Sequence, residues 1–524
     1  MASILTNSSA MVALQTLNST NKNLNQIQEQ ISTGKKVGSA KDNAAVWAIS
    51  SVMQSDVKGF KGISESLSLG ASTVEVGRQA AETVTELLTD IKGKIVASQE
   101  ENVDRAKIQT DIKALRDQIN SVLGAAQFNG KNLVDSYEQT SVLSSLDRSG
   151  NGSVSSSSIS FNGQNLTSEA GTVETATAID RIGTVADDGT YTVGAGATLS
   201  NAANDATITI ATDMADGDTL SIDFGDQQFT FTNNTGAAIV VADLDDIVAA
   251  GLANLGVEGV TTAVSGAGEV TVSSTNSFES ITMQGSSTGA TTFVVDPDAG
   301  GAQVAGAAGA AGTLTARAET VSLGGAGNTG GVVNEGDGFR ISLGGQNFDY
   351  TAKDGDTLND VATGLKRVID AGGVDGITVQ VNLSDDPISQ PPTLQIDNDN
   401  ASTVALTVDD GSGGVASGGL VGLDGIDVST ADGAANALAN IESLIQTSID
   451  AAAEFGSVQG RIDIQADFVK SLSDSLTSGI GALVDADLEE ASARLQALQV
   501  QQQLGIQALS IANQAPQSVL SLFR

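Results

Sequence analysis

Apolar residues recur at helical spacing at both ends of the chain. Near the start, positions 14, 17, 21, 24, 28 and 31 alternate steps of three and four, and four of them are Leu or Ile. This heptad pattern predicts a helix that packs its apolar seam on another helix. Gly34 is expected to end that helix, and Ser39 followed by Asp42 fits a capping box at the start of the next.

Two more helices are predicted before residue 130. Apolar positions at helical spacing run from 44 to 98, a stretch that would be about 80 Å long at 1.5 Å per residue. Asp104 can cap a third helix, because its carboxylate can accept from the free amides of the first turn. Asn129-Gly130 then predicts a tight turn.

The C-terminal part shows the same heptad pattern. Apolar or small residues occupy eight of the nine heptad positions from 484 to 512, with Gln502 as the polar exception, and Pro516 is expected to end the run. Another amphipathic helix is predicted around 438–449. The first and last helices should run antiparallel, since the chain leaves and returns. Their predicted seam residues are Leu14, Leu17, Leu24, Ile31, Val484, Leu488, Leu495, Leu498 and Leu509.

Two arrangements fit this seam: a helix hairpin within one chain, or contacts between chains. Small residues at Ala491, Gly505 and Ala512 suit close packing against several neighbours. A two-helix pair would also leave most of its surface exposed. These features favour self-association.

The middle of the chain contains a repeat with strand periodicity. Residues 217–232 and 336–351 are identical at seven of sixteen positions, and apolar residues alternate in both. Each segment predicts a β-hairpin, followed by a short helix and further strands. The result is an α+β fold: long terminal helices form coiled-coil rod domains, and the β-rich inserted outer region contains two ββαββ-like modules.

Four regions follow from these patterns. Residues 1–38 and 484–524 form an inner terminal coiled-coil domain, and 39–180 with 431–483 form a helical rod domain with a β-hairpin. Residues 181–299 form the first outer module. Residues 300–430 form a linker, rich in small residues up to 312, and the second outer module.

Composition narrows the chemistry. The chain has no Cys and no His, which removes disulfides, thiolate-bound metals, and Cys or His catalysis. Its net charge is −38, and the middle region carries most of the excess acid. Nucleic acid and anionic membranes are therefore not expected as partners. No run of about 20 apolar residues predicts a membrane span.

No cofactor, metal or enzymatic activity is expected. The acidic clusters Asp354-Gly355-Asp356 and Asp397-Asn398-Asp399 could bind Ca²⁺, but no segment has a complete EF-hand loop, and turns explain these residues better. Paired carboxylates for glycoside hydrolysis remain chemically possible. With 3% aromatic residues, little is available to stack on a sugar.

Both ends of the sequence resemble bacterial flagellins. The resemblance rests on 24–36, 39–45, Gln127-Phe128-Asn129-Gly130, and 508–524. It implies a structural subunit of the flagellar filament that is exported unfolded and self-assembles into a helical tube for motility. Implied partners are other flagellin subunits, the flagellar secretion apparatus, an export chaperone, and the cap and hook-junction proteins. The implied location is the extracellular filament. The alternatives are a hook-filament junction protein and a secreted surface-binding module.

The resemblance also bears on recognition by the animal innate immune receptor. Flagellins that activate it carry an Arg and a Leu one turn apart on the long helix and a Glu on the next. Counting back from the turn at 127–130 puts Leu87, Ile91 and Asp111 at these positions. Replacing Arg by Leu removes a charge and five donors. We expect weak or absent activation, as in flagellins of alphaproteobacteria.

Overall fold

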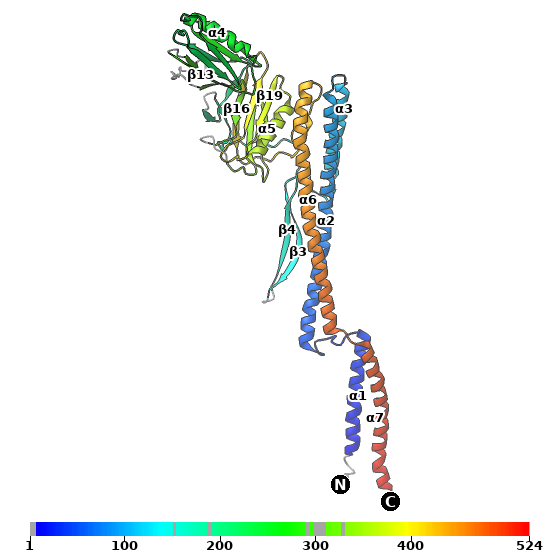
Figure 1. Ribbon diagram of the computed structural model, residues 1–524. Helices are drawn as coiled ribbons and strands as arrows, with labels where there is room; N and C mark the ends of the chain where they lie inside the picture. Colours follow the sequence, from blue (N-terminus) through cyan, green and yellow to red (C-terminus); the bar gives the residue numbers. More distant parts are fainter. Residues whose placement is uncertain are drawn as a thin grey trace. The chain divides into compact units, whose positions relative to one another are not determined.

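The computed structural model describes residues 7–149, 153–186, 190–289, 293–296, 311–325 and 331–522 (Figure 1). Helices occupy both ends of the sequence, and strands occupy the middle, as the α+β prediction requires. The chain divides into two compact units. The first takes in the chain up to Glu75, the segment Gln139–Phe161, and the chain from Phe455. The second comprises Val76–Glu138 and Asn162–Glu454.

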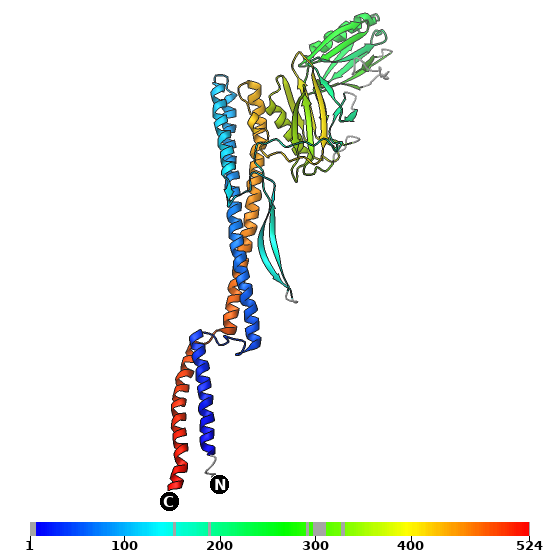
Figure 2. The same ribbon diagram turned by 180° about the vertical axis from the view of Figure 1, so that it is seen from behind.

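The first unit contains the terminal helices. α1 (Ser8–Thr33) ends at Gly34, whose φ of 68° is the left-handed conformation expected of a terminating glycine. α7 (Leu488–Leu522) lies beside it in both views (Figures 1 and 2). α2 (Ala44–Ser98) begins in this unit, and α6 (Ala431–Val484) ends in it. The predicted bounds of the long helix, 44 and 98, are therefore confirmed.

The start of α2 is capped by a different residue from the one that the sequence predicts. The Val46 amide donates to Asn43 Oδ1 at 3.2 Å, so Asn43 caps the helix. Asp42 instead accepts from the backbone amides of Gly38 and Ser39, at 3.1 and 2.9 Å. The predicted cap at Ser39 is wrong, because these hydrogen bonds close a separate turn just before the helix. The Ser39 backbone and hydroxyl donors also hold the pKa of Asp42 below its usual value.

A β-hairpin packs on the helices of the first unit. It consists of β3 (Gln139–Arg148) and β4 (Val154–Asn162). Gly59 and Gly70 of α2 face it: a Cβ on either would come within 2.6 Å of Leu146 or Val142. Gln465 Nε2 of α6 donates to the Ser144 carbonyl at 2.9 Å. Glycine lowers helix propensity by about 1 kcal/mol, and here it lets a strand approach closely.

The helical part of the second unit contains α3 (Arg105–Ala125), with η1 (Leu423–Gly425) nearby. Asp104 caps α3 as predicted, accepting from the Lys107 amide at 3.2 Å. After α3, β1 (Gln127–Phe128) pairs with β2 (Lys131–Asn132). The intervening Asn129 and Gly130 have φ of 51° and 80°, the two positive values of a type I′ turn.

The first outer module is built from two four-stranded sheets, ordered β10-β9-β13-β15 and β11-β12-β8-β14. One helix, α4 (Val241–Asn254), contributes Leu244 and Val248 to the core. The strands are β8 (Asn204–Ile210), β9 (Thr219–Phe224), β10 (Gln227–Thr232), β11 (Val260–Gly266), β12 (Glu269–Ser274), β13 (Ile281–Ser287), β14 (Phe293–Asp296) and β15 (Ala311–Leu314).

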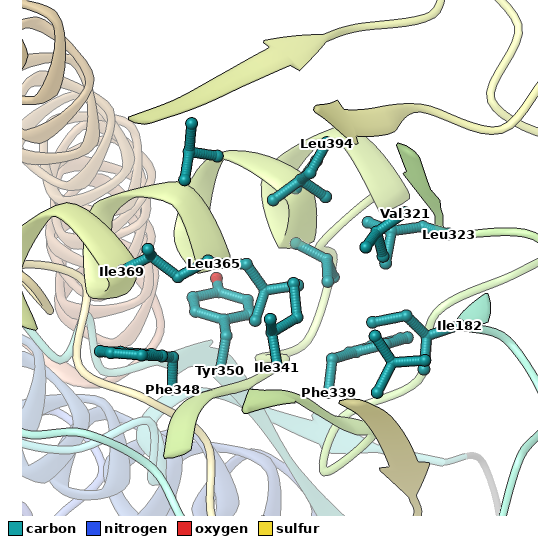
Figure 3. Close-up of a cluster of buried hydrophobic side chains, with 14 of the residues drawn as sticks. Ile182, Val321, Leu323, Phe339, Ile341, Phe348, Tyr350, Leu365, Ile369 and Leu394 are labelled. Carbon is teal, nitrogen blue, oxygen red and sulfur yellow. The ribbon is translucent and has the colours of Figure 1, made fainter. Parts of the chain in front are cut away.

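The second outer module has the same plan, with sheets ordered β18-β17-β21-β7 and β19-β20-β16-β5-β6. Its helix α5 (Leu358–Gly372) covers a core that includes Phe339, Ile341 and Leu365 (Figure 3). The strands are β5 (Gly183–Val185), β6 (Tyr191–Val193), β7 (Ala197–Leu199), β16 (Glu319–Ser322), β17 (Gly338–Leu343), β18 (Gln346–Thr351), β19 (Ile377–Asn382), β20 (Thr393–Asn398) and β21 (Val404–Gly411).

The structure confirms the internal repeat. The order β9-β10-α4-β11-β12 matches β17-β18-α5-β19-β20. Equivalent backbone bonds recur, with the Gly217 amide donating to Asn233 at 2.7 Å and the Gly336 amide to Ala352 at 2.9 Å. The two ββαββ-like modules are therefore copies of one plan.

The modules are nested, which the sequence did not indicate. β5, β6 and β7 fall within 181–299, yet they belong to the sheets of the second module: β5 pairs with β16, β7 pairs with β21, and β6 pairs with β5. β15, at the end of the expected linker, pairs with β13 of the first. The first module is therefore inserted between β7 and β16. Strands of three or four residues carry too little periodicity to reveal this. Residues 300–310 of the expected linker lie outside the described residues.

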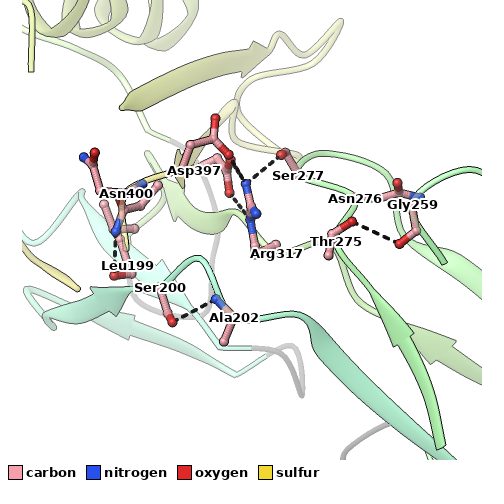
Figure 4. Close-up of polar contacts among 12 residues, drawn as sticks. Leu199, Ser200, Ala202, Gly259, Thr275, Asn276, Ser277, Arg317, Asp397 and Asn400 are labelled. Atoms are coloured by element: carbon pink, nitrogen blue, oxygen red, sulfur yellow. Dashed lines mark hydrogen bonds and ion pairs between the residues drawn. The ribbon is translucent and has the colours of Figure 1, made fainter. Parts of the chain in front are cut away.

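One side chain joins the two modules. Arg317, between β15 and β16, donates through Nε to Asp397 Oδ1 at 2.8 Å (Figure 4). It also pairs with Asp399. Its second guanidinium nitrogen donates to Ser277 of the first module at 3.1 Å. Asp397 is almost completely buried. Burial alone would raise its pKa, but hydrogen bonds from Arg317 and Ser277 hold the pKa below its usual value.

Candidate assembly surface

The two terminal helices form an antiparallel pair. Gly505 faces Leu17, and Gln502 Nε2 donates to Asn21 Oδ1 at 2.7 Å. Just after the end of α1, the Lys36 amide donates to the Val484 carbonyl at 2.6 Å. Residue numbers rise along α1 as they fall along α7, as the sequence predicts.

Backbone hydrogen bonds join the segment that follows α1 to the segment that precedes α7. The Ala486 amide donates to the Gly34 carbonyl at 2.9 Å. Asp487 Oδ1 accepts from the amides of Glu489 and Glu490 at 3.0 and 3.1 Å, so it caps α7. The two acidic residues that follow also suit the positive end of the helix.

The seam predicted at the C-terminal end faces α1 almost throughout. Val484, the last residue of α6, is buried, whereas Leu495, Leu498 and Leu509 of α7 are half-buried. Leu488 is the exception among these positions, because half of it is exposed. The small residue Gly505 lets Leu17 approach, since a Cβ at 505 would lie 3.3 Å from Leu17 Cδ1.

Along α1, alternate positions of the buried seam lie one residue earlier than the sequence predicts. Leu24 is buried, and Leu17 and Ile31 are half-buried, as expected. Leu14, however, is half exposed. Thr20 and Ile27 are buried instead, and neither was identified from the sequence. The spacing 24, 27, 31 also satisfies a heptad, so Ile27 offered a signal that could have found the shift.

Asn21 and Gln502 are polar residues at seam positions, and they meet. A polar pair in an apolar seam stabilises less than two Leu residues would, but it specifies the register. In any other register each amide would face apolar side chains without a partner, which is unfavourable.

The pair leaves many large apolar side chains in solvent. Leu504 is 58% exposed, compared with 8% for Leu24 in the seam. The other half-exposed or more exposed side chains on α1 and α7 are Met11, Val12, Leu14, Leu488, Val500, Ile506 and Ile511. Farther along the same unit, Trp47, Ile464 and Phe468 are also exposed. An apolar surface of this extent is typical of an interaction site.

The C-terminal limit of the last helix was predicted wrongly. Pro516 was expected to end the heptad run, but α7 continues to Leu522. Proline removes a donor from the helix, and continuation is easier when another group satisfies the carbonyl left free.

The three positions that the family resemblance relates to receptor recognition, Leu87, Ile91 and Asp111, lie in the second unit. Leu87 and Ile91 are buried in the monomer. Asp111 is exposed and pairs with Lys94 at 2.6 Å. The first two side chains are therefore not available at the surface of the folded monomer.

Each of the two candidate calcium clusters has a carboxylate that is engaged within the protein. Asp356 Oδ2 accepts from the Tyr350 hydroxyl at 2.8 Å and the Lys353 amide at 3.1 Å. Asp397 pairs with Arg317. Across the described part of the chain, no cluster of three or more His, Cys, Asp or Glu could hold a metal. No helix among the same residues is long and apolar enough to span a bilayer.

Comparison with known proteins gives matches at both ends. The family model "Bacterial flagellin N-terminal helical region" matches residues 4–139, and "Bacterial flagellin C-terminal helical region" matches residues 438–523. Flagellin A and Flagellin B of Rhizobium meliloti are each 31% identical to this chain over 529 residues, and each alignment covers 100% of both chains. A flagellin of Brucella melitensis is 44% identical over 153 residues, which is 29% of this chain and 54% of the relative.

Similarity to solved structures is low. The crystal structure of Xanthomonas campestris FlgL has a TM-score of 0.30 and 9% identity, over 82% of this chain and 98% of that chain. The flagellar hook associated protein-3 of Legionella pneumophila has a TM-score of 0.25 and 8% identity, over 86% and 98%. Scores at this level carry no argument for the junction-protein alternative.

Proposed function

Because the chain belongs to the bacterial flagellin family, it is a structural subunit of the extracellular flagellar filament, and we propose that α1 and α7 are the helices through which its copies assemble. Its full-length relatives are of the alphaproteobacterial type. The observation that supports the proposal is the apolar surface of the α1–α7 pair. A single pair buries one seam, and Met11, Val500, Leu504 and Ile511 remain in solvent. Neighbouring copies would cover them.

A charge at an exposed seam-flanking position tests this proposal. Leu504→Glu should leave the monomer folded, because Leu504 is already 58% exposed. If neighbouring copies bury it, an unpaired carboxylate there is strongly unfavourable. Electron microscopy after salt-induced polymerisation should show loss of filaments.

The matched control is Leu383→Glu, on an outer module with 60% exposure. It makes the same chemical change at a similarly exposed site, and filaments should form normally. Filaments of ordinary length from Leu504→Glu would contradict the proposal.

We further propose that the chain is exported unfolded by the flagellar secretion apparatus, with an export chaperone, and is added beneath a cap beyond the hook-junction proteins. The absence of Cys supports export, because no premature disulfide can form. Fusion to a tightly folded domain should block secretion. Normal secretion of that fusion would contradict export in the unfolded state.

We also propose a division of labour along the chain. Residues 1–38 with 484–524 would assemble, 39–180 with 431–483 would form a helical rod, and the nested modules would be structural rather than enzymatic. The engaged carboxylates of Asp356 and Asp397 support this interpretation. Deleting 204–314, which spans β8 to β15 of the first module, should leave polymerisation intact, and loss of polymerisation would contradict the division.

Weak activation of the innate immune receptor is a separate proposal. Leu87 lacks the positive charge of an Arg, and both Leu87 and Ile91 are buried. Purified monomer should give little response in reporter cells. A response equal to that of an activating flagellin would contradict it.

A further inference from the structure

Position 516 leaves one backbone carbonyl of α7 without its helical donor. In an α-helix, each carbonyl accepts from the amide four residues later. The partner of the Ala512 carbonyl would be residue 516, which is proline and has no N–H. α7 nevertheless runs through this position to Leu522.

A side chain at the other end of the sequence supplies the missing donor. Asn7 Nδ2 donates to the Ala512 carbonyl at 2.8 Å. The Oδ1 atom of the same amide accepts from the Ala10 amide at 3.1 Å and caps α1. One amide group therefore satisfies a free donor of α1 and a free acceptor of α7.

We propose that Asn7 is a positioning residue that fixes the register of α1 on α7 by donating to the carbonyl freed by Pro516. The inference rests on the proposed role of this pair in assembly. Only asparagine or glutamine among the short polar side chains offers both an amide donor and a carbonyl acceptor. We call the hydrogen bond between Asn7 and the Ala512 carbonyl the tie. Proline at 516 makes the tie specific for one register, because at other nearby positions of α7 the carbonyl already has a helical donor.

The tie complements the polar contacts farther along the pair. Gln502 and Asn21 set the register in the middle, and the Lys36–Val484 bond sets it at the turn. Asn7 acts at the open end, where helices fray most easily. A fixed open end presents Met11 and Ile511 in one arrangement to the neighbouring copies.

Two substitutions separate the tie from the cap. Asn7→Asp keeps an excellent helix cap but cannot donate to Ala512. Asn7→Ser also keeps a cap and avoids the added charge. Pro516→Ala restores an N–H at 516, so the Ala512 carbonyl regains a donor within its own helix.

Register can be read from a disulfide, because the chain has no native Cys. Leu17 Cβ and a Cβ at Gly505 would be 3.9 Å apart, which is within the range for a disulfide. In full-length monomer carrying Leu17→Cys and Gly505→Cys, the rate of disulfide formation measures how often the native register is populated. The unmodified Asn7–Pro516 background is the reference.

Asn7→Asp and Asn7→Ser should each slow disulfide formation several-fold. In the Pro516→Ala background the same changes should have a much smaller effect. Equal slowing in both backgrounds, or no slowing in either, would overturn the proposal. The assay uses monomers, so its outcome is independent of whether Leu504→Glu abolishes filaments.

Discussion

The terminal helix pair and the outer modules bury their apolar residues to very different extents. In the modules, Ile222 and Ile341 are fully enclosed within one chain. In the α1–α7 pair, Leu24 and Ile27 are buried, while Leu504 and Ile511 on the same helices are mostly exposed. The difference shows where a single chain is complete and where it needs other copies.

Geometry explains the contrast. A module encloses its core between two sheets and a helix, so apolar side chains are covered from several directions. Two helices share one seam, and each can bury only a stripe of its surface. The remaining apolar side chains stay exposed to solvent until helices of other copies pack on them. The outer modules, by contrast, carry a net negative charge, which favours repulsion between modules of different copies.

The largest effect on the monomer should come from the core of a module. Ile341→Ala removes a fully buried side chain and should lower the free energy of unfolding by about 2–5 kcal/mol. Leu504→Ala should change it by about 0.5 kcal/mol or less, since that site is exposed. Urea unfolding of the two monomers measures both values. Equal losses would remove the contrast between the regions.

The next effect concerns the junction of the modules. Arg317→Met leaves Asp397 buried without its charged partner, which should cost about 1–3 kcal/mol in unfolding free energy. Arg340→Met is the control, because its pair with Asp349 is within one module and partly exposed. Its loss should cost at most about 1 kcal/mol. If Arg340→Met lowered the unfolding free energy more than Arg317→Met, burial of the ion pair at the junction would not be what determines its contribution to stability.

The same junction should respond to acid. The pKa of Asp397 is lower in the folded chain than in the unfolded chain, so the unfolded state takes up its proton first. This stabilisation is present above about pH 4 and is lost as the pH falls through the folded pKa. Urea unfolding between about pH 3 and about pH 6, which spans the usual titration of a carboxyl group, should show this component in the wild type. Arg317→Met should lack it, and an unchanged acid response in that variant would contradict the assignment.

The smallest effect should come from the polar pair in the seam. Asn21→Leu with Gln502→Leu replaces an amide pair by apolar residues and should stabilise the α1–α7 pair by roughly 1 kcal/mol while loosening its register. Circular dichroism during thermal unfolding measures the stability. Competition between cysteines at 17 and alternative positions on α7 measures the register. Tighter register in the double variant would contradict this role.

Local signals predicted much of the fold. The limits of α2, the Asp104 cap and the Asn129-Gly130 turn each depend on residues close in sequence. The repeated ββαββ order was visible because both copies lie in one chain. These features are determined by short-range periodicity and capping, which a single sequence records.

Other features depend on partners distant in sequence. β5 to β7 join the second module across the whole first module. The burial of Thr20 and Ile27, each one residue before a predicted seam position, depends on how closely α7 approaches α1. Continuation of α7 past Pro516 involves Asn7, 505 residues before Ala512. The heptad pattern identified most of the α7 seam. It did not identify which apolar side chains stay exposed and available for contacts with other copies.

Hydrogen exchange of the monomer and the filament tests the central claim most directly. If α1 and α7 complete their core only between copies, their amides should exchange rapidly in the monomer and slow by on the order of a hundredfold in the filament. The β-strands of both modules should be equally protected in the two states. Strong protection of α1 and α7 in the monomer, unchanged on polymerisation, would contradict the account.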